Sequence, residues 1–287
     1  MNPEKIAFLV DSCADLSRQY CEGKPIYTVP LRIGCADGDH NDGEDITGED
    51  VYLRQDLGEL PRTSLPDMYR VGAALDQIQA DGYRKVLALP LSSGLSGTHN
   101  MFRLQCEDRD DLETVVVETK SGSLGIGMVV LQLWEDVKNG MSWEELSGER
   151  VRYLFANTHP YFSVDTLEFL QKGGRIGKIT ALTGTLLNIK PILSFADDGQ
   201  LTNVAKVRGR RQVAGKLIDL VKSHLGDHKV FNLAVANGGT HEEMEALKIR
   251  LMAAIPGCQN IWDADIDATL GSYVGRGMLG AAIQLLD

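Results

Sequence analysis

The chain has 287 residues, of which 43% are hydrophobic and 24% are charged. This length and composition support one large globular domain or two ordinary ones, which excludes a disordered or a fibrous protein. The 29 basic and 40 acidic side chains give a net charge of -11, and an acidic surface argues against nucleic acid as a partner because it repels polyanions.

Cysteine usage and hydropathy predict a cytoplasmic protein. The five cysteines are scattered and contain no Cys-x-x-Cys pair, so neither a disulfide framework nor a thiolate zinc site is expected. The longest uncharged apolar stretches contain glycine and are too short to cross a bilayer, and residues 1–5 lack the apolar segment of a signal peptide. We therefore expect reduced thiols, no metal and no stable membrane insertion.

The first half of the chain alternates between predicted strands and helices. Short apolar runs indicate buried parallel strands, and apolar residues spaced three or four apart indicate helices. Residues 26–33 alternate in polarity and are expected to form an added edge strand. In chain order, strands are predicted at residues 5–10, 86–89 and 114–117, and helices at 66–80 and 128–137. This order predicts a three-layer α/β/α domain with a mainly parallel sheet.

A second α/β unit with a mixed sheet is predicted after Gly140. Asp198-Gly199 is a hairpin signal between two of its strands. We expect, in order, a helical segment, two strands, a helix, a strand, a helix and a strand, at residues 142–174, 191–195, 201–207, 212–224, 230–235, 241–254 and 259–265. The domain boundary is placed at residue 150, which gives domains over 1–150 and 151–287.

Hydroxyl-rich segments follow several of the predicted elements. Thr63 and Ser64 precede Pro66 at the expected start of a helix, where either can serve as the N-cap. Asp11-Ser12 ends the first strand, and a glycine-rich turn over residues 92–97 leaves the strand at 86–89. Ligands of open α/β sheets lie beyond the C-terminal strand ends, where helix N-termini attract anions, so a carboxylate or phosphate site is expected where these segments meet. Ordinary turn and cap residues are the alternative for any one serine.

These segments resemble motifs of the DegV family of fatty-acid-binding proteins. The run from Asp165 to Ile176, followed by Leu187 to Leu193, is similar to the family signature. Three family motifs, Asp-Ser-Thr-Ala-Asp, Thr-Ser-x-Pro and Ser-Ser-x-Leu-Ser-Gly-Thr, stand here as Asp11-Ser12-Cys13-Ala14-Asp15, Thr63-Ser64-Leu65-Pro66 and Ser92-Ser93-Gly94-Leu95-Ser96-Gly97-Thr98. The resemblance spans Asp11 to Gly280 and implies a two-domain fold with a ligand tunnel between the domains.

The resemblance also implies a function. A DegV-like protein holds a long-chain fatty acid and presents its carboxylate to a separate fatty acid kinase, which makes an acyl phosphate for phospholipid synthesis. No catalytic residue and no cofactor besides the fatty acid are expected in such a carrier. Thr63 and Ser93, with Ser92 close by, would donate hydrogen bonds to the carboxylate, since bonds to a charged acceptor are the stronger ones. The implied lipid-binding residues are Ser12, Thr63, Ser64, Ser92, Ser93, Gly94, Ser96, Gly97, Arg175 and Tyr273.

Two further regions receive roles from the resemblance. Residues 179–189, with Leu182, Leu186 and Leu187, would cover the acyl chain. The basic run over residues 206–211 contains a Lys-Val-Arg-Gly similar to that of the family, and its Arg208 would contact the kinase. A solvated basic face is the alternative for this run.

The C-terminal motif departs from the family. Members have His-x-Gly-Pro-Gly, whereas this chain has Tyr273-Val274-Gly275-Arg276-Gly277. A phenol still donates a hydrogen bond but does not titrate near neutral pH as an imidazole does. Either the chain binds lipid with a different or weaker kinase-linked role, or Arg276 compensates.

Two other functions remain open from the sequence. A serine hydrolase would use Ser93 or Ser96 with His99, His159 or His241 as the base. A phosphate- or sugar-phosphate-binding subunit related to dihydroxyacetone kinases would have a polar cavity with no apolar tunnel behind it. A calcium loop is not expected at residues 37–43, because the glycine is one position late and Gly48 stands where a bidentate acid is needed; a polar hairpin turn is predicted there.

Overall fold

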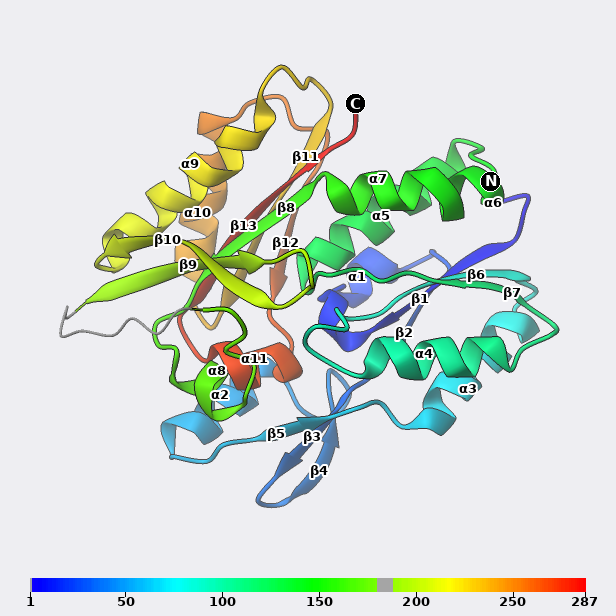
Figure 1. Ribbon diagram of the computed structural model, residues 1–287, viewed down its shortest axis with the longest axis horizontal. Coiled ribbons are helices and arrows are strands. Elements are labelled where there is room, and N and C mark those ends of the chain that lie inside the picture. The colour runs from blue at the N-terminus through cyan, green and yellow to red at the C-terminus, as the bar shows by residue number, and fades with distance from the viewer. Residues whose placement is uncertain (1, 180–187) are drawn as a thin grey trace.

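The computed structural model describes residues 2–179 and 188–287, which form two α/β units lying side by side (Figure 1). Among these residues, the N-terminal unit has a sheet in the order β2-β1-β6-β7, and the C-terminal unit has a sheet in the order β10-β9-β8-β13-β11-β12. A small sheet in the order β4-β3-β5 completes the described strands. No helix in this part of the chain is long and apolar enough to cross a membrane.

The bounds of the elements are as follows. The strands are β1 (Ile6–Asp11), β2 (Ile26–Val29), β3 (Arg32–Cys35), β4 (Gly38–Asn41), β5 (Arg62–Ser64), β6 (Lys85–Leu89), β7 (Glu113–Val116), β8 (Thr158–Ser163), β9 (Ile189–Phe195), β10 (Leu201–Arg208), β11 (Phe231–Gly238), β12 (Ile261–Asp265) and β13 (Met278–Leu285). The helices are α1 (Arg18–Cys21), α2 (Gly48–Asp56), α3 (Met68–Ala80), α4 (Thr98–Glu107), α5 (Leu124–Lys138), α6 (Trp143–Glu145), α7 (Val151–Ala156), α8 (Glu168–Lys172), α9 (Val213–Leu225), α10 (His241–Ala254) and α11 (Ala268–Val274).

Helices cover both faces of the N-terminal sheet. Every residue of β1 is buried, and successive side chains of a strand point to opposite faces. Ile6, Phe8 and Val10 therefore pack with α5 on one face, while Ala7 and Leu9 pack with α3 and α4 on the other. The strands pair in parallel, so the predicted α/β/α domain with a parallel sheet is confirmed.

The C-terminal sheet is mixed, as predicted. Its central strand β13 runs antiparallel to both β8 and β11, and β11 runs parallel to β12. One face packs on α9 and α10, and α5 of the other unit contacts β8, β11 and β13 from the opposite side. Gln132 of α5 accepts a hydrogen bond of 3.0 Å from Asn232 of β11, so a buried polar contact also joins the units.

The prediction of a helical segment over residues 142–174 is wrong at its centre. A π-helical turn at Leu146–Arg150 joins α6 to α7, and the chain then enters β8. The run Thr158–Ser163 contains Tyr161 and Phe162, which favour a strand, and it pairs with β13 over nearly its whole length. Pro160 has no backbone N–H to donate to a neighbouring strand. It is tolerated because β8 pairs with β9 through Phe162 and Ser163 and not through Pro160. Pairing between distant segments therefore decided this element.

The edge strand predicted over residues 26–33 is split. β2 is the edge of the parallel sheet, but residues from Arg32 onward enter the small sheet, in which β3 pairs with both β4 and β5. Thr63 and Ser64 lie in β5, so the prediction that one of them caps a helix is also wrong. The N-cap of α3 is Asp67, whose side chain accepts a hydrogen bond from the backbone N–H of Tyr69.

Candidate functional site

A cavity of about 350 Å³ lies between the two units. Its wall is contributed by the loops after β6 and β7, by α5, α8 and α11, by β5 of the small sheet, and by the inner face of the C-terminal sheet. Most of its lining side chains are apolar, and they include Leu91, Leu124, Leu170 and Phe195. The polar lining residues are Thr63, Ser64, Ser96, Ser123, Arg175, Thr269, Tyr161 and Tyr273.

Small residues on two neighbouring strands make room for the cavity. Ala234 of β11 pairs with Ala282 of β13, and Ala236 pairs with Gly280, so the four lie in adjacent rows of the sheet. All four line the cavity. Larger side chains at these positions would fill the space, because each stands on a rigid, buried strand. The signal of this feature in the sequence is small residues at every second position of two buried strands, which lie outside the motifs described above.

A phenol and two hydroxyl-bearing segments form the polar part of the wall. The Tyr273 hydroxyl lies 2.5 Å from Thr63 Oγ1, which joins α11 to β5. Ser96 Oγ lies 2.8 Å from Thr98 Oγ1 at the start of α4. Gly97 is the N-cap of α4 and makes no side-chain cap, while the N–H of Thr98 donates to Ser96 Oγ, so the positive dipole end of this helix lies beside the cavity.

Arg175 brings a positive charge to the same part of the wall. Its Nε donates to the carbonyl oxygen of Leu95 at 3.2 Å, and its Nη1 donates to that of Gly173 at 3.0 Å. The guanidinium carbon lies 5.2 Å from the centroid of the Tyr273 ring, within range of a cation–π contact. Within residues 2–179 and 188–287, Arg175 forms no ion pair with a carboxylate, so its charge is available to an anion in the cavity.

Glycines permit this arrangement. Gly173 ends α8, and a Cβ atom at this position would collide with the Tyr273 ring. Gly174 follows with a φ of 72°, a conformation that other residues adopt only under strain. Gly173 and Gly174 thus end the helix, and Gly173 also leaves room for the Tyr273 ring next to Arg175.

Four of the predicted lipid-binding residues do not line the cavity. Ser92 Oγ is buried and donates to the carbonyl oxygen of Gly199, and Gly94 packs against the same glycine. Ser93 is exposed, and its backbone N–H donates to Glu118. Ser12 donates to Asp42 and accepts from the backbone of Leu31. Ser92, Gly94 and Ser12 thus hold loops in place because their polar groups are already paired within the protein.

The remaining predicted residues divide into two groups. Thr63, Ser64, Ser96, Gly97, Arg175 and Tyr273 line the cavity. Arg208 is exposed at the end of β10 and does not line it. Leu182, Leu186 and Leu187, which were expected to cover an acyl chain, lie outside the described residues.

Buried carboxyl groups hold the helix that carries Tyr273. Asp42 accepts hydrogen bonds from the backbone N–H groups of Ala268 and Thr269, and Asp15 accepts one from Asp267. These bonds satisfy N–H groups at and before the first turn of α11, and negative charge is favourable at that end of a helix. Burial raises the pKa of the Asp15 and Asp267 carboxyl groups.

Asp11 links the first strand to the loop after β6. It accepts hydrogen bonds from the backbone N–H groups of Leu91 at 2.7 Å and Cys13 at 3.0 Å. Burial nevertheless raises the pKa of Asp11 to about 7. The expected meeting of the three hydroxyl-rich segments at one edge of one sheet is therefore only partly correct, because Asp11 and Leu91 meet there while Thr63 belongs to the small sheet.

The fold and this site define a two-domain α/β protein with a mainly apolar ligand cavity and an anion-attracting polar wall. Comparison with known proteins agrees with that class. A family model described as "Uncharacterised protein, DegV family" matches residues 5–285. The chain belongs to the DegV family, which confirms the resemblance found in the sequence.

Similar proteins cover the whole chain. A DegV domain-containing protein of Clostridium perfringens is 34% identical, and one of Clostridium acetobutylicum is 32% identical; each match covers 98% of this chain and 99% of the relative. Among solved structures, a fatty-acid-binding DegV family protein from Thermus thermophilus has a TM-score of 0.91 at 28% identity, covering 98% of this chain and all of that one. DegV from Bacillus subtilis, a fatty acid binding protein, has a TM-score of 0.87 at 26% identity, covering 98% and 99%.

Proposed function

We propose that this protein is a carrier that binds a long-chain fatty acid in the cavity and presents its carboxylate to a fatty acid kinase. The observation that carries the proposal is the combination of a mainly apolar wall with a cluster of Thr63, Tyr273 and Arg175. Fatty acid binding by the Thermus thermophilus and Bacillus subtilis relatives supports it.

The carboxylate would lie against Thr63, Ser96 and Tyr273. Thr63 and Tyr273 share one hydrogen bond, so this pair has one hydroxyl proton left for the carboxylate, and Ser96 supplies a second when Thr98 donates to it. Arg175 supplies a positive charge that has no carboxylate partner among the described residues. Ser64 and Gly97 complete this part of the wall. Hydrogen bonds to an ionised acceptor contribute about 1.5–3 kcal/mol each, so two or three donors suffice to orient the head group. Ser12, Ser92, Ser93 and Gly94 are assigned to loop structure instead.

The acyl tail would supply most of the affinity. Burial of one methylene contributes about 0.8 kcal/mol, so about ten enclosed methylenes give on the order of 8 kcal/mol before ordering costs. A phosphate or sugar phosphate would gain little from this apolar wall. Nor does the geometry favour a serine hydrolase: among the described residues, Ser96 Oγ contacts Thr98 Oγ1 rather than an imidazole.

Transfer to a kinase would use the protein surface. Arg208 is exposed on β10 and remains our candidate for the kinase contact, which would link the carrier to acyl phosphate formation and phospholipid synthesis. Tyr273 occupies the place of the family histidine, so presentation would rely on a neutral phenol held by Thr63 and Arg175.

Mass spectrometry of the organic extract from denatured, purified protein tests the proposal. The expected result is one long-chain fatty acid per chain, or stoichiometric uptake when delipidated protein is mixed with oleate or stearate. A protein that carries no fatty acid and takes up neither would contradict it. Turnover of activated esters with covalent labelling by a serine-directed probe would favour the hydrolase instead.

A further inference from the structure

The β3–β4 hairpin gathers three different metal-ligating side chains outside the cavity. The Sγ atom of Cys35, a carboxylate oxygen of Asp37 and a ring nitrogen of His40 all lie within 4.8 Å of one another. None of the three lines the cavity. We propose that Cys35, Asp37 and His40 bind one divalent transition-metal ion of the zinc class.

Strand register brings the thiol and the imidazole together. Cys35 pairs with Gly38, and Ile33 pairs with His40, so Cys35 and His40 are diagonal neighbours on one face of the hairpin. Asp37 lies in the turn between the strands, where Gly38 has a φ of 136° that permits a tight reversal. The thiol and the imidazole therefore come from paired strands, and the carboxylate comes from the turn that joins them.

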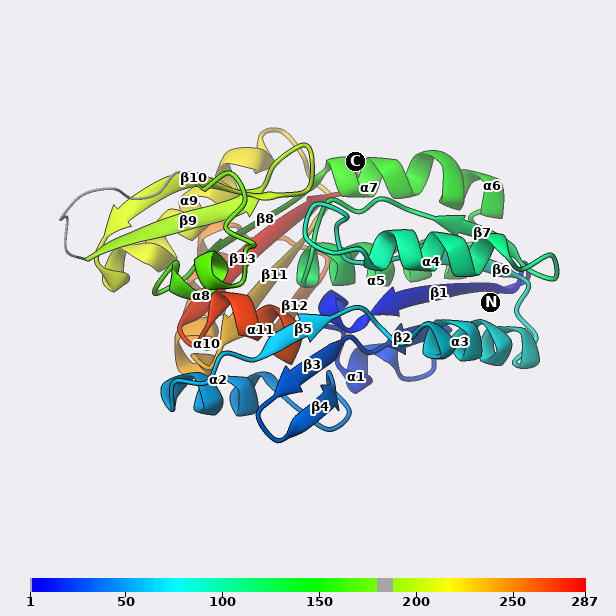
Figure 2. The same ribbon diagram turned by 60° about the horizontal axis from the view of Figure 1, so that its bottom comes forward.

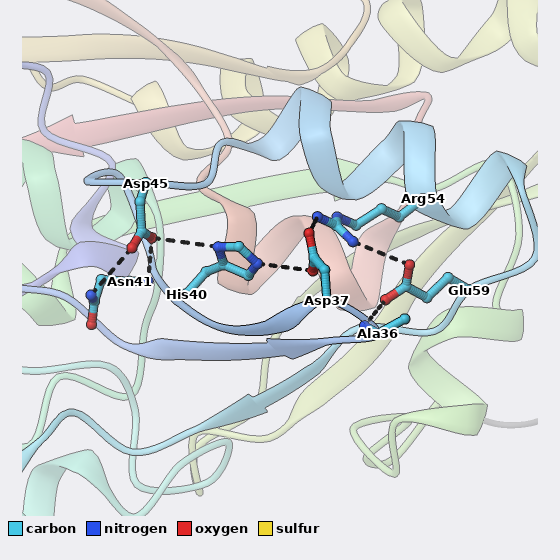
Figure 3. A network of polar contacts seen from close by, with 7 residues as sticks. All are labelled: Ala36, Asp37, His40, Asn41, Asp45, Arg54 and Glu59. Atoms are coloured by element: carbon cyan, nitrogen blue, oxygen red, sulfur yellow. Dashed lines mark hydrogen bonds and ion pairs between the residues drawn. The ribbon is translucent and has the colours of Figure 1, made fainter.

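His40 has a carboxylate near each of its ring nitrogens. Its Nε2 lies 3.0 Å from Asp37 Oδ1, within hydrogen-bonding distance, and its Nδ1 lies 3.9 Å from Asp45 Oδ1, beyond that distance (Figure 3). A metal ion at Nε2 would take the place of the contact with Asp37 and leave Nδ1–H on the side of Asp45. A small movement of that carboxylate would then give the carboxylate–histidine–metal arrangement typical of zinc sites.

An ion pair with Arg54 also holds the Asp37 carboxylate in place. Arg54 Nη2 lies 2.7 Å from Asp37 Oδ2, which leaves Oδ1 directed at His40, and Arg54 Nη1 lies 3.3 Å from Glu59 (Figure 3). Glu59 in turn accepts a hydrogen bond from the backbone N–H of Ala36. An ordinary surface ion pair explains the contact of Asp37 with Arg54, and packing against the buried cluster that contains Ile33 and Val51 gives Cys35 a structural role as well. Neither contact explains why a thiol, an imidazole and a carboxylate converge at one point.

The ligand set indicates which metal fits. Thiolate, imidazole and carboxylate together suit Zn²⁺ or a similar borderline ion, whereas Ca²⁺ and Mg²⁺ require oxygen ligands. Water would complete a four-coordinate site, since Asp37 is open to solvent. The thiolate and the Asp37 carboxylate neutralise a divalent charge, and Glu59 balances Arg54. Ligand atoms of tetrahedral zinc lie about 3.5 Å apart, so small side-chain rotations complete the site.

A second cluster, Cys13, Asp42 and Asp267, is less suited to a metal. The oxygens of Asp42 already accept hydrogen bonds from Ser12, Ala268 and Thr269. The hairpin ligands, in contrast, are accessible from solvent. A metal there would also stiffen the sheet that carries Thr63, because His40, Ile33 and Thr63 occupy one row across β4, β3 and β5.

Titration of delipidated, metal-free protein with Co²⁺ tests the site, because tetrahedral coordination of cobalt by a thiolate is visible in its absorption spectrum. Competition between Co²⁺ and Zn²⁺ then gives the affinity for Zn²⁺. We expect one equivalent bound with a thiolate charge-transfer band. The band should disappear in Cys35→Ser and persist in Cys258→Ser, a half-buried cysteine elsewhere. His40→Gln and Asp45→Asn should weaken Zn²⁺ binding, the latter by about 10–100-fold, as carboxylates behind ligating histidines do.

Circular dichroism of the metal-free variants provides the folding control. The proposal is overturned if wild-type protein shows no cobalt–thiolate band at a tenfold excess of Co²⁺, or if Cys35→Ser and His40→Gln, both folded, bind as tightly as wild type. Because the readout is metal alone, either result is independent of whether the cavity binds a fatty acid.

Discussion

The hydroxyl groups of Thr63 and Tyr273 lie 2.5 Å apart although 210 positions separate them in the chain. The contact joins a short strand of the small sheet to α11, and α2, which lies between β4 and β5 in the chain, packs beside α11 (Figure 2). A phenol can therefore occupy the family's histidine position and still point at the cavity. The proposed head-group site depends on this pairing.

Tyr273→Phe should weaken fatty acid binding by about tenfold to a hundredfold. The change removes one donor to a charged acceptor, worth about 1.5–3 kcal/mol, and each 1.4 kcal/mol corresponds to a factor of ten. Displacement of a fluorescent fatty acid measures the affinity. Tyr69→Phe, at a tyrosine that is 81% exposed, is the control, and equal affinities in the two variants would rule out the role of Tyr273.

Arg175→Gln should discriminate between ligands by charge. We expect it to weaken binding of a long-chain fatty acid by tenfold or more, because the positive charge opposite the carboxylate is lost, and to leave the alcohol of equal chain length nearly unaffected. Calorimetric titration with the two ligands gives both affinities. Lys172→Gln, at the end of α8, tests for a nonspecific effect of removing one positive charge. If Arg175→Gln weakened binding of the acid and of the alcohol equally, Arg175 would only support the fold.

Ser96→Ala should weaken fatty acid binding, whereas Ser93→Ala should leave the affinity within about twofold of wild type. Ser96 lines the cavity, while Ser93 is exposed away from it. Ser92→Ala should instead lower the free energy of unfolding by about 1–3 kcal/mol, since it leaves the buried Gly199 carbonyl without its partner. Urea unfolding and ligand displacement separate the effects. Strong loss of binding in folded Ser93→Ala would restore the original assignment.

Ala282→Leu should shorten the ligand that the cavity accepts. The added side chain projects from β13 into the cavity beside Ala234, so stearate should bind less tightly while a shorter acid such as laurate is affected less. Competition between the two acids measures the shift. Ala253→Leu on the exposed side of α10 is the matched substitution. An unchanged preference would show that the tail does not reach Ala282.

The contribution of Asp11 to stability should fall as the pH rises from about 4 to about 7. Burial raises the folded-state pKa of Asp11 to about 7, whereas an unfolded aspartate titrates near 3.8. In this window the folded state binds more protons, so the free energy of unfolding decreases with pH, by at most about 1.4 kcal/mol per unit for one group. Asp15 and Asp267 shift in the same direction, whereas burial lowers the pKa of His159 and His224, which contribute with the opposite sign in this window.

Urea unfolding of wild type and Asp11→Asn from pH 4 to pH 8 checks this expectation. The free energy of unfolding of wild type, relative to that of the variant, should decrease as the pH rises, because the amide does not ionise. Asp111 has a pKa lowered to about 2 by the Arg109 guanidinium, so its stabilising contribution is lost only below about pH 4, outside this window. Identical slopes in the two proteins would mean that Asp11 does not titrate there.

Local sequence determined the parts of this protein whose signals are contiguous. The buried run of β1, the helical spacing of α10 and the Asp198-Gly199 hairpin between β9 and β10 follow from side-chain periodicity and turn chemistry. Thr63, Ser96, Arg175 and Tyr273, which the family motifs contain, line one cavity, and their contact with a lipid stays a prediction.

Tertiary structure alone decided which hydroxyls face that space. Ser92, Ser93 and Ser96 share one short turn, but a buried bond to Gly199 directs Ser92 away and leaves Ser96 on the cavity wall. The strand conformation of β8 likewise depends on a distant segment, because β8 pairs with β13, which lies more than a hundred residues later in the chain. A motif fixes which chemical groups are present, whereas the direction in which each group points depends on partners that lie far away in the sequence.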